Sequence, residues 1–181
     1  VYDLDSRAVM TLARDMRDRG ELPSGRRIEP APRFLIGCAD SPVDPAPDWK
    51  PKGLEAKIAA GAEFAQTQFC FDLDVARQYM ERLQREGITD KLKFIIGVGP
   101  IRSAKSARWM NDNLFGVHVP EPIIARLEAA GDAAAAAAEG RKICAELIQG
   151  LQQIPGVAGA HVMAPAQGPD AIAQVLTAVG R

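Results

Sequence analysis

Short apolar runs alternate with segments of helical periodicity along most of this chain, and this order restricts the fold more than any other feature of the sequence. Strands that alternate with helices form parallel sheets, because each helix returns the chain across the sheet in a right-handed crossover. The continuous run 33–39, RFLIGCA, is typical of a strand buried on both faces. The sequence therefore predicts an α/β fold of parallel βα repeats, with strands at 33–39, 63–68, 92–98 and 158–164.

Capping residues, prolines and glycines mark the helices that separate these strands. Asp5 or Ser6 can cap a first helix that ends at residue 20. A long alanine-rich helix is expected from Asp132 to residue 153, with interruptions at Gly140 and Gly150. The other helices are expected at about 53–60, 74–86, 101–113, 119–130 and 169–179.

Four strands, each followed by a helix, resemble half of a (β/α)8 TIM barrel, which usually needs about 250 residues. A chain of 181 residues falls short of that length and favours a single domain. Two arrangements stay open. The sheet is either open and complete with covered edges, or it is the second half of a barrel whose other strands lie on a missing segment or on another chain.

Composition and charge exclude several classes of function. A formal net charge of -1 gives no electrostatic reason to bind nucleic acid or an anionic membrane. No window of about 18 apolar residues is present for a membrane span, so we expect a cytoplasmic protein. The chain has two histidines and three widely spaced cysteines, which predicts reduced core thiols and no metal site; the cysteines are Cys38, Cys70 and Cys144.

Polar residues gather where the second expected strand ends. Thr67 and Gln68 close that strand, and Asp72 can cap the helix that follows. In parallel α/β folds the carboxyl ends of the strands face one crevice, where ligands bind. The Gln68 amide could therefore contact a ligand or bond to loop backbone. Lys57 could contact a phosphate group or be an ordinary exposed helix lysine.

The loops at the same end of the sheet are rich in small residues. Glycines and alanines there allow either a flat ligand to approach the backbone or the chain to turn tightly. Trp49 and Trp109 could stack on a ligand or simply pack. No nucleotide-binding glycine motif and no nucleophile turn is present. Residue chemistry alone predicts an α/β protein that binds a small ligand; the small residues are Gly97, Gly99, Ala164 and Ala166.

Several long strings of the chain, taken together, resemble the C-terminal half of the methylenetetrahydrofolate reductase family. The resemblance covers nearly the whole chain from Tyr2. It rests most firmly on the block around AGAEFAQTQFCFD and on the block GPIRSAKSARWMN; the other strings are VYDLDS, FLIGCADSP and EGRKICAELIQGLQQIPGVAGAHVMA.

The resemblance implies a barrel that carries FAD and reduces 5,10-methylenetetrahydrofolate to 5-methyltetrahydrofolate with NADH or NADPH. It implies that residues 1–181 form one domain with strands five to eight of the barrel, and that the segment 3–19 is the helix before the fifth strand. The N-terminal half would then be absent from this chain. The implied partners are the folate substrate, the missing half or a second chain that completes the barrel, and further copies in a homo-oligomer.

The resemblance also implies roles for individual residues. Gln68 matches the glutamine that contacts the folate pterin, and Lys57 matches a lysine near the cofactor phosphates. Tyr2 and Asp3 fall where the chain of the family passes the FAD. Ala39 falls where some members place an aromatic residue beside the cofactor.

Two positions depart from the pattern of the family. Met110 or, with one shift, Trp109 stands where some members use an aromatic residue near the substrate. Gln167 aligns near an arginine that holds the folate tail, and a carboxamide has no charge to pair with a carboxylate.

The acid glutamate and the flavin-tuning aspartate of the family belong to its N-terminal half. This chain is therefore expected to hold no catalytic residue and to supply binding and orientation. The alternatives are a non-catalytic binding module or accessory subunit of a methyl-transfer system, and a different α/β enzyme that uses the same crevice without flavin.

Overall fold

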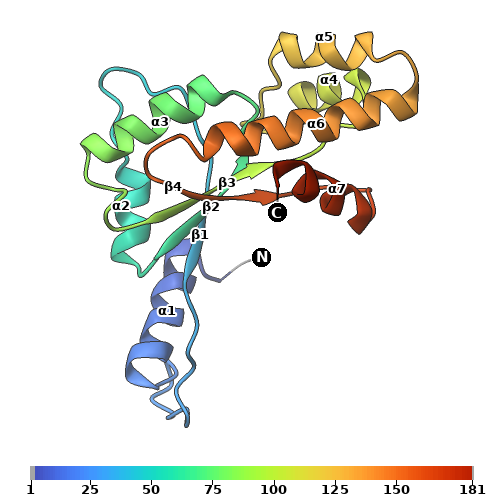
Figure 1. Cartoon of the computed structure of the whole chain (residues 1–181). Helices are drawn as coiled ribbons and strands as arrows, with labels where there is room; N and C mark the ends of the chain where they lie inside the picture. Colours follow the sequence, from blue (N-terminus) through green and yellow to red (C-terminus); the bar gives the residue numbers. More distant parts are fainter. Residues whose placement is uncertain (1–2, 181) are drawn as a thin grey trace.

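Four parallel strands form one open sheet in the computed structural model, which describes residues 3–180 (Figure 1). The strands stand side by side in chain order, and each neighbouring pair is parallel. This arrangement confirms the predicted α/β fold of parallel βα repeats and is that of a partial βα barrel. The strands are β1 (Gly37–Asp40), β2 (Phe64–Phe69), β3 (Lys93–Val98) and β4 (Val157–Val162).

Helices cover one face of this sheet. In Figure 1, α3 and α6 lie along that face, and α1 extends away from it beside the long connector to β1. The core fills the space between the sheet and the helices, with Phe94 and Ile96 of β3 and Tyr79 and Leu83 of α3 almost fully buried. The helices are α1 (Ser6–Arg19), α2 (Lys52–Ala59), α3 (Leu73–Arg85), α4 (Ala104–Asn113), α5 (Glu121–Ala129), α6 (Ala133–Leu151) and α7 (Pro169–Val179).

The other face of the sheet is much less covered. Ala39, Gln66, Ile95 and Gly159 lie opposite one another across the four strands, so they share this face. Ala39 and Gln66 are exposed, whereas their neighbours along β2, Ala65 and Thr67, are buried against the helices. Within the described residues, β1 and β4 each have a strand on one side only. The sheet therefore has two open edges and one open face.

The first strand differs from its prediction. The apolar run from residue 33 does not form a strand until Gly37, and it is not buried on both faces, since Leu35 is 66% exposed. The prediction assumed that both faces of the strand were covered, and β1 instead borders the open face and an open edge. A side chain holds the preceding segment in place, because the Ile36 N–H donates to the Glu63 carboxylate at 3.1 Å.

Most predicted helix ends agree with the structure to within one or two residues. The Asp5 carboxylate accepts from the Ala8 N–H at 2.8 Å, and Asp72 caps α3 in the same way, which confirms both caps. The helix expected from residue 101 begins at Ala104, because the Ser103 hydroxyl accepts from the Ser106 N–H and caps it there.

The expected interruptions of α6 are wrong. The helix is continuous through Gly140, where a Cβ would overlap the Ile101 carbonyl oxygen of the loop after β3. This glycine serves close packing and does not end the helix. No helix in residues 3–180 is long and apolar enough to cross a membrane.

Candidate functional site

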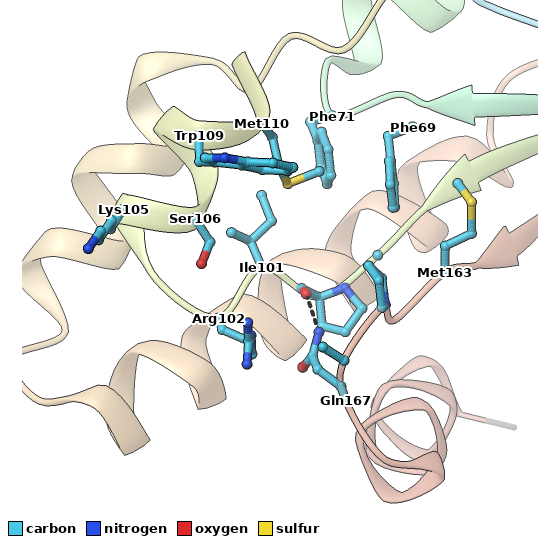
Figure 2. A pocket seen from close by; sticks show the side chains of 14 residues that line it. Phe69, Phe71, Ile101, Arg102, Lys105, Ser106, Trp109, Met110, Met163 and Gln167 are labelled. Carbon is cyan, nitrogen blue, oxygen red and sulfur yellow. Dashed lines mark hydrogen bonds between the residues drawn. The ribbon is translucent and has the colours of Figure 1, made fainter. Parts of the chain in front are cut away.

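A pocket of about 400 Å³ opens at the carboxyl ends of β2, β3 and β4 (Figure 2). This is the end of a parallel sheet at which the sequence predicts a ligand. The loops that follow these strands supply most of the wall, and the first turns of α4 supply the rest. The lining residues are Phe69, Phe71, Gly99, Pro100, Ile101, Arg102, Lys105, Ser106, Trp109, Met110, Met163, Pro165, Ala166 and Gln167.

Aromatic side chains form one wall of the pocket. The rings of Phe69 and Phe71 are stacked, with centroids 5.4 Å apart and planes inclined by 15°. Figure 2 shows the indole of Trp109 and the sulfur of Met110 beside these rings. Trp109 is 55% exposed, which leaves much of its side chain uncovered in the described structure. Such a wall suits a flat ring that stacks on aromatic faces.

Thr67 fixes the end of β2, from which Phe69 projects. The pairing of β2 with β3 shifts register between Gln66 and Phe69. At this irregularity the Thr67 hydroxyl accepts from the Gly97 N–H at 2.9 Å and donates to the Gln68 carbonyl at 2.9 Å. The hydroxyl therefore takes the place of a backbone group in the sheet, and this explains a buried polar side chain within the strand.

Gln68 lies at the end of β2 but does not line the pocket. Its side-chain Oε1 accepts from the Phe69 N–H at 3.0 Å, so the carboxamide is bonded to backbone. This contact uses the oxygen of the carboxamide, and within residues 3–180 the NH₂ group forms no hydrogen bond. A ligand contact by Gln68 stays a prediction that would use this NH₂ group.

Met110 and Gln167 both line the pocket, and their contact with a substrate stays a prediction. The Gln167 Nε2 donates to the Pro100 carbonyl at 2.8 Å and joins the loop after β4 to the loop after β3 (Figure 2). Ala166, the residue before it, has a φ of 56°, a conformation that non-glycine residues seldom adopt. The loop after β4 is thus held in an unusual turn against the pocket.

Lys57 and Ala39 meet at β1, away from the pocket. The Lys57 ammonium donates to the Ala39 carbonyl at 2.6 Å. The Ile36 carbonyl accepts from the Glu63 N–H, just before β2. Because backbone carbonyls alternate in direction along a strand, the Ala39 carbonyl points the other way, toward the open edge of β1. Asp3 is exposed ahead of α1, and Tyr2 lies outside the described residues. Of the four residues expected near a cofactor, the structure therefore brings two into contact, Ala39 and Lys57.

The small residues predicted to admit a flat ligand have contacts within the protein. A Cβ at Gly99 would overlap the Met163 carbonyl oxygen, and one at Gly97 would lie 2.5 Å from the Thr67 carbonyl oxygen. Both glycines therefore allow the loops and strands to pack closely. Trp49 packs on Tyr79 with ring centroids 5.6 Å apart, and does not line the pocket.

Sequence reasoning did not single out several lining residues, among them Phe71, Arg102 and Lys105. The only signal for them was their position just after a strand end, which they share with many loop residues. No aspartate or glutamate lines the pocket. Its polar side chains can bind and orient a ligand, but no carboxyl group there can donate a proton to it. Within residues 3–180, no cluster of side chains is suited to hold a metal ion.

A partly buried carboxylate, that of Asp40, lies instead at the end of β1. The Asp40 carboxylate accepts from the Tyr79 hydroxyl at 2.8 Å. Burial raises the pKa of Asp40 above its usual range, and the bond from Tyr79 partly opposes this rise. Burial also raises the pKa of Tyr79. The pair therefore links β1 to α3, and neither member lines the pocket.

Comparisons with known proteins agree on one family. The family model for methylenetetrahydrofolate reductase matches residues 24–180. A probable methylenetetrahydrofolate reductase (NADPH) from Caenorhabditis elegans is 28% identical over 146 residues, with 69% of this chain and 22% of that protein covered. This chain therefore spans only a small part of that relative.

A solved structure shares the fold. It is an uncharacterized protein from Clostridium thermocellum that binds two copies of 5-methyl-5,6,7,8-tetrahydrofolic acid. The two superpose with a TM-score of 0.56 at 16% sequence identity, and the match covers 97% of this chain and 58% of that one. Nearly the whole of this chain therefore superposes on somewhat more than half of that protein.

Proposed function

Because the chain belongs to the methylenetetrahydrofolate reductase family, we propose that its pocket binds a reduced folate for flavin-dependent reduction of 5,10-methylenetetrahydrofolate. In this proposal the chain supplies the binding and orienting half of an oxidoreductase that uses NADH or NADPH. The product is 5-methyltetrahydrofolate.

One observation carries this proposal, the aromatic pocket at the carboxyl ends of β2–β4. Its volume of about 400 Å³ is in the range of small-molecule sites. The stacked rings of Phe69 and Phe71 and the exposed indole of Trp109 offer flat faces to a flat ligand. A pterin is such a ligand, and its ring edges carry donors and acceptors that the Gln68 NH₂ group could reach beside the pocket.

The residues at the end of β1 fit a flavin nucleotide beside this pocket. The Lys57 ammonium has three N–H donors and uses one of them on the Ala39 carbonyl, which leaves donors for phosphate oxygens. The small, exposed side chain of Ala39 leaves the adjoining surface open. When bound, FAD supplies hydride transfer from the nicotinamide to the folate. Gln68 is the second-last residue of β2, the strand between β1 and β3.

Further βα units would complete the barrel in this proposal. The open edges of β1 and β4 and the open face of the sheet are where additional parallel strands would pair and pack. These strands belong to the same polypeptide or to a second chain. They also supply the proton donor, because no carboxylate of residues 3–180 lines the pocket.

Titration with 5-methyltetrahydrofolate tests the proposal. The chain has two tryptophans, and only Trp109 lines the pocket, so binding should change the fluorescence of Trp109. We expect the signal to persist in Trp49→Phe and to disappear in Trp109→Phe. By calorimetry, Trp109→Ala should bind the folate about tenfold more weakly, because it loses a stacking face. A signal that depends on Trp49 instead would contradict the placement of the site.

A folate-binding module without redox activity is the second candidate, and the absence of a carboxylate in the pocket lining favours it. The purified natural assembly distinguishes the two candidates. Bound flavin in its absorption spectrum and NADH oxidation that requires methylenetetrahydrofolate support the reductase. Tight folate binding by a colourless assembly that oxidises no NADH or NADPH supports the binding module.

A further inference from the structure

His161 of β4 bonds to the backbone of a strand that is not its neighbour. Its imidazole Nε2 donates to the Thr67 carbonyl of β2 at 2.9 Å, although β3 lies between the two strands. His161 pairs with Gly97 of β3, and a Cβ at Gly97 would lie 2.5 Å from the same carbonyl oxygen. The missing side chain at Gly97 therefore leaves room for the imidazole to reach β2.

The carbonyl that accepts from His161 belongs to a bulge in β2. Gln66 pairs with Ile95 and Phe69 with Gly97, so two residues of β2, Thr67 and Gln68, lie opposite a single residue of β3. Side chains supply the missing hydrogen bonds. The Thr67 hydroxyl donates to the Gln68 carbonyl, and His161 donates to the Thr67 carbonyl. Both carbonyls of the bulge therefore have a side-chain donor, and the second donor comes from a different strand.

The bulge determines how the side chain of Gln68 is held. The Gln68 Oε1 accepts from the Phe69 N–H at 3.0 Å, so the direction of the carboxamide follows the backbone of the bulge. Bulges are common beside active sites, because they change the direction in which a side chain projects. A displacement of the Thr67 carbonyl would therefore also displace the Gln68 carboxamide.

We infer that His161 is a positioning residue for folate binding, and that it acts through Gln68. The inference rests on the proposed function, since it concerns the same ligand. His161 does not line the pocket, so its effect passes through β2 and not through contact with the folate. It shares the open face of the sheet with Gly159 and is no part of the core under the helices. The hydrogen bond also fixes the ring, because a carbonyl only accepts and Nε2 must carry a proton.

A double-mutant cycle between His161 and Gln68 tests the inference. Calorimetry with 5-methyltetrahydrofolate measures affinity in His161→Leu, Gln68→Ala and the double variant of the natural assembly. We expect His161→Leu to weaken binding about 3- to 10-fold alone and less than about twofold when Gln68 is already alanine. His161→Gln keeps an N–H donor near the place of Nε2 and should restore affinity to within about twofold. His118→Leu, the same change at an exposed histidine outside the pocket, is the matched control and should change nothing.

Nitrogen NMR gives a second measurement, which needs no ligand. The chain has two histidines, so His118→Leu assigns the remaining imidazole signals to His161. We expect the neutral ring to carry its proton on Nε2, and this proton to exchange slowly with water. A ring protonated on Nδ1 alone would contradict the contact and overturn the inference.

The other outcomes are equally decisive. An equal loss of affinity from His161→Leu with and without Gln68 would show that the histidine supports the fold in general, and would overturn the inference. Equal weakening by His161→Leu and His161→Gln would exclude the donor role. Thermal denaturation checks that each variant is folded; if His161→Leu is not, His161→Asn replaces it, because its shorter side chain cannot reach β2. Failure of the natural assembly to bind the folate would overturn the proposed function too, whereas the outcomes above leave that binding intact.

Discussion

Asp40, which is partly buried, and Tyr79, which is buried, form a hydrogen-bonded pair between β1 and α3, with 2.8 Å between the carboxylate and hydroxyl oxygens. The pKa of Asp40 is raised above its value of 3.8 in unfolded chains, mainly by burial. A raised folded pKa means that the folded state favours the protonated acid. The contribution of Asp40 to stability is therefore greatest below about pH 4 and falls as the pH rises through its folded pKa.

This pH dependence of stability gives a prediction for the variant Tyr79→Phe. The variant leaves the Asp40 carboxylate without the donor that stabilises its charge, so its pKa should rise further. The free energy of unfolding near neutral pH should fall by about 1–3 kcal/mol, and the loss should be smaller near pH 4. Urea denaturation at both pH values measures this difference. An equal loss at the two pH values would contradict the charge-based account.

Asp40→Asn is the matched control for that variant. It keeps an oxygen that accepts from Tyr79 and removes the buried charge. We expect it to be at least as stable as the natural protein near neutral pH.

At the scale of single residues, the sequence indicated where polar groups would gather but not how they would be used. It placed Thr67 and Gln68 at the end of a strand and Asp72 at a helix start, and the cap was confirmed. That the Thr67 hydroxyl would replace a backbone group could not be predicted, because this depends on the register of β2 against β3. The partners of Gln167 and Lys57 likewise lie on distant segments of the chain.

At the scale of elements, α6 shows that a glycine in a sequence can indicate either a helix end or a close packing contact. Gly140 suggested a break, since glycine is a poor helix former. In the structure it lets the helix pack against the Ile101 carbonyl in the loop that lines the pocket. Local propensity alone could not distinguish these two roles, because the deciding contact lies about 40 residues away in the sequence.

Gly140→Ala should therefore be destabilising although alanine is the better helix former. Its Cβ would overlap backbone that cannot easily move, and we expect a loss of about 1–3 kcal/mol in the free energy of unfolding. The overlap should also displace the loop after β3 and weaken folate binding. Thermal denaturation and calorimetry measure the two effects.

Gly53→Ala provides the control. It lies in α2 with open space around the position of a Cβ, and should raise stability by up to about 1 kcal/mol. A neutral or stabilising Gly140→Ala would show that the helix does not depend on this contact.

At the scale of the whole molecule, the alternation of strands and helices was enough to predict the parallel sheet and the approximate place of each strand in the sequence. The open face was not foreseen, because run 33–39 reads as a strand covered on both sides. Hydrophobicity reports how apolar a strand is but not which partner covers it. Leu35 and Gln66 are exposed, and in the proposed function they belong to the surface that further barrel strands would cover.

The pocket at the carboxyl ends of the strands is the physical basis of the proposed function. The aromatic wall lies at the carboxyl ends of β2 and β3, and Gln68 is the second-last residue of β2. A folate that used this wall would lie with its heterocycle stacked on the aromatic rings. This placement is the central claim at the scale of the molecule.

A crystal structure of the natural assembly with 5-methyltetrahydrofolate tests this claim most directly. We predict one folate in the pocket, with its rings on Trp109 and the Phe69–Phe71 pair. A folate bound at another face of the sheet while this pocket stays empty would contradict it.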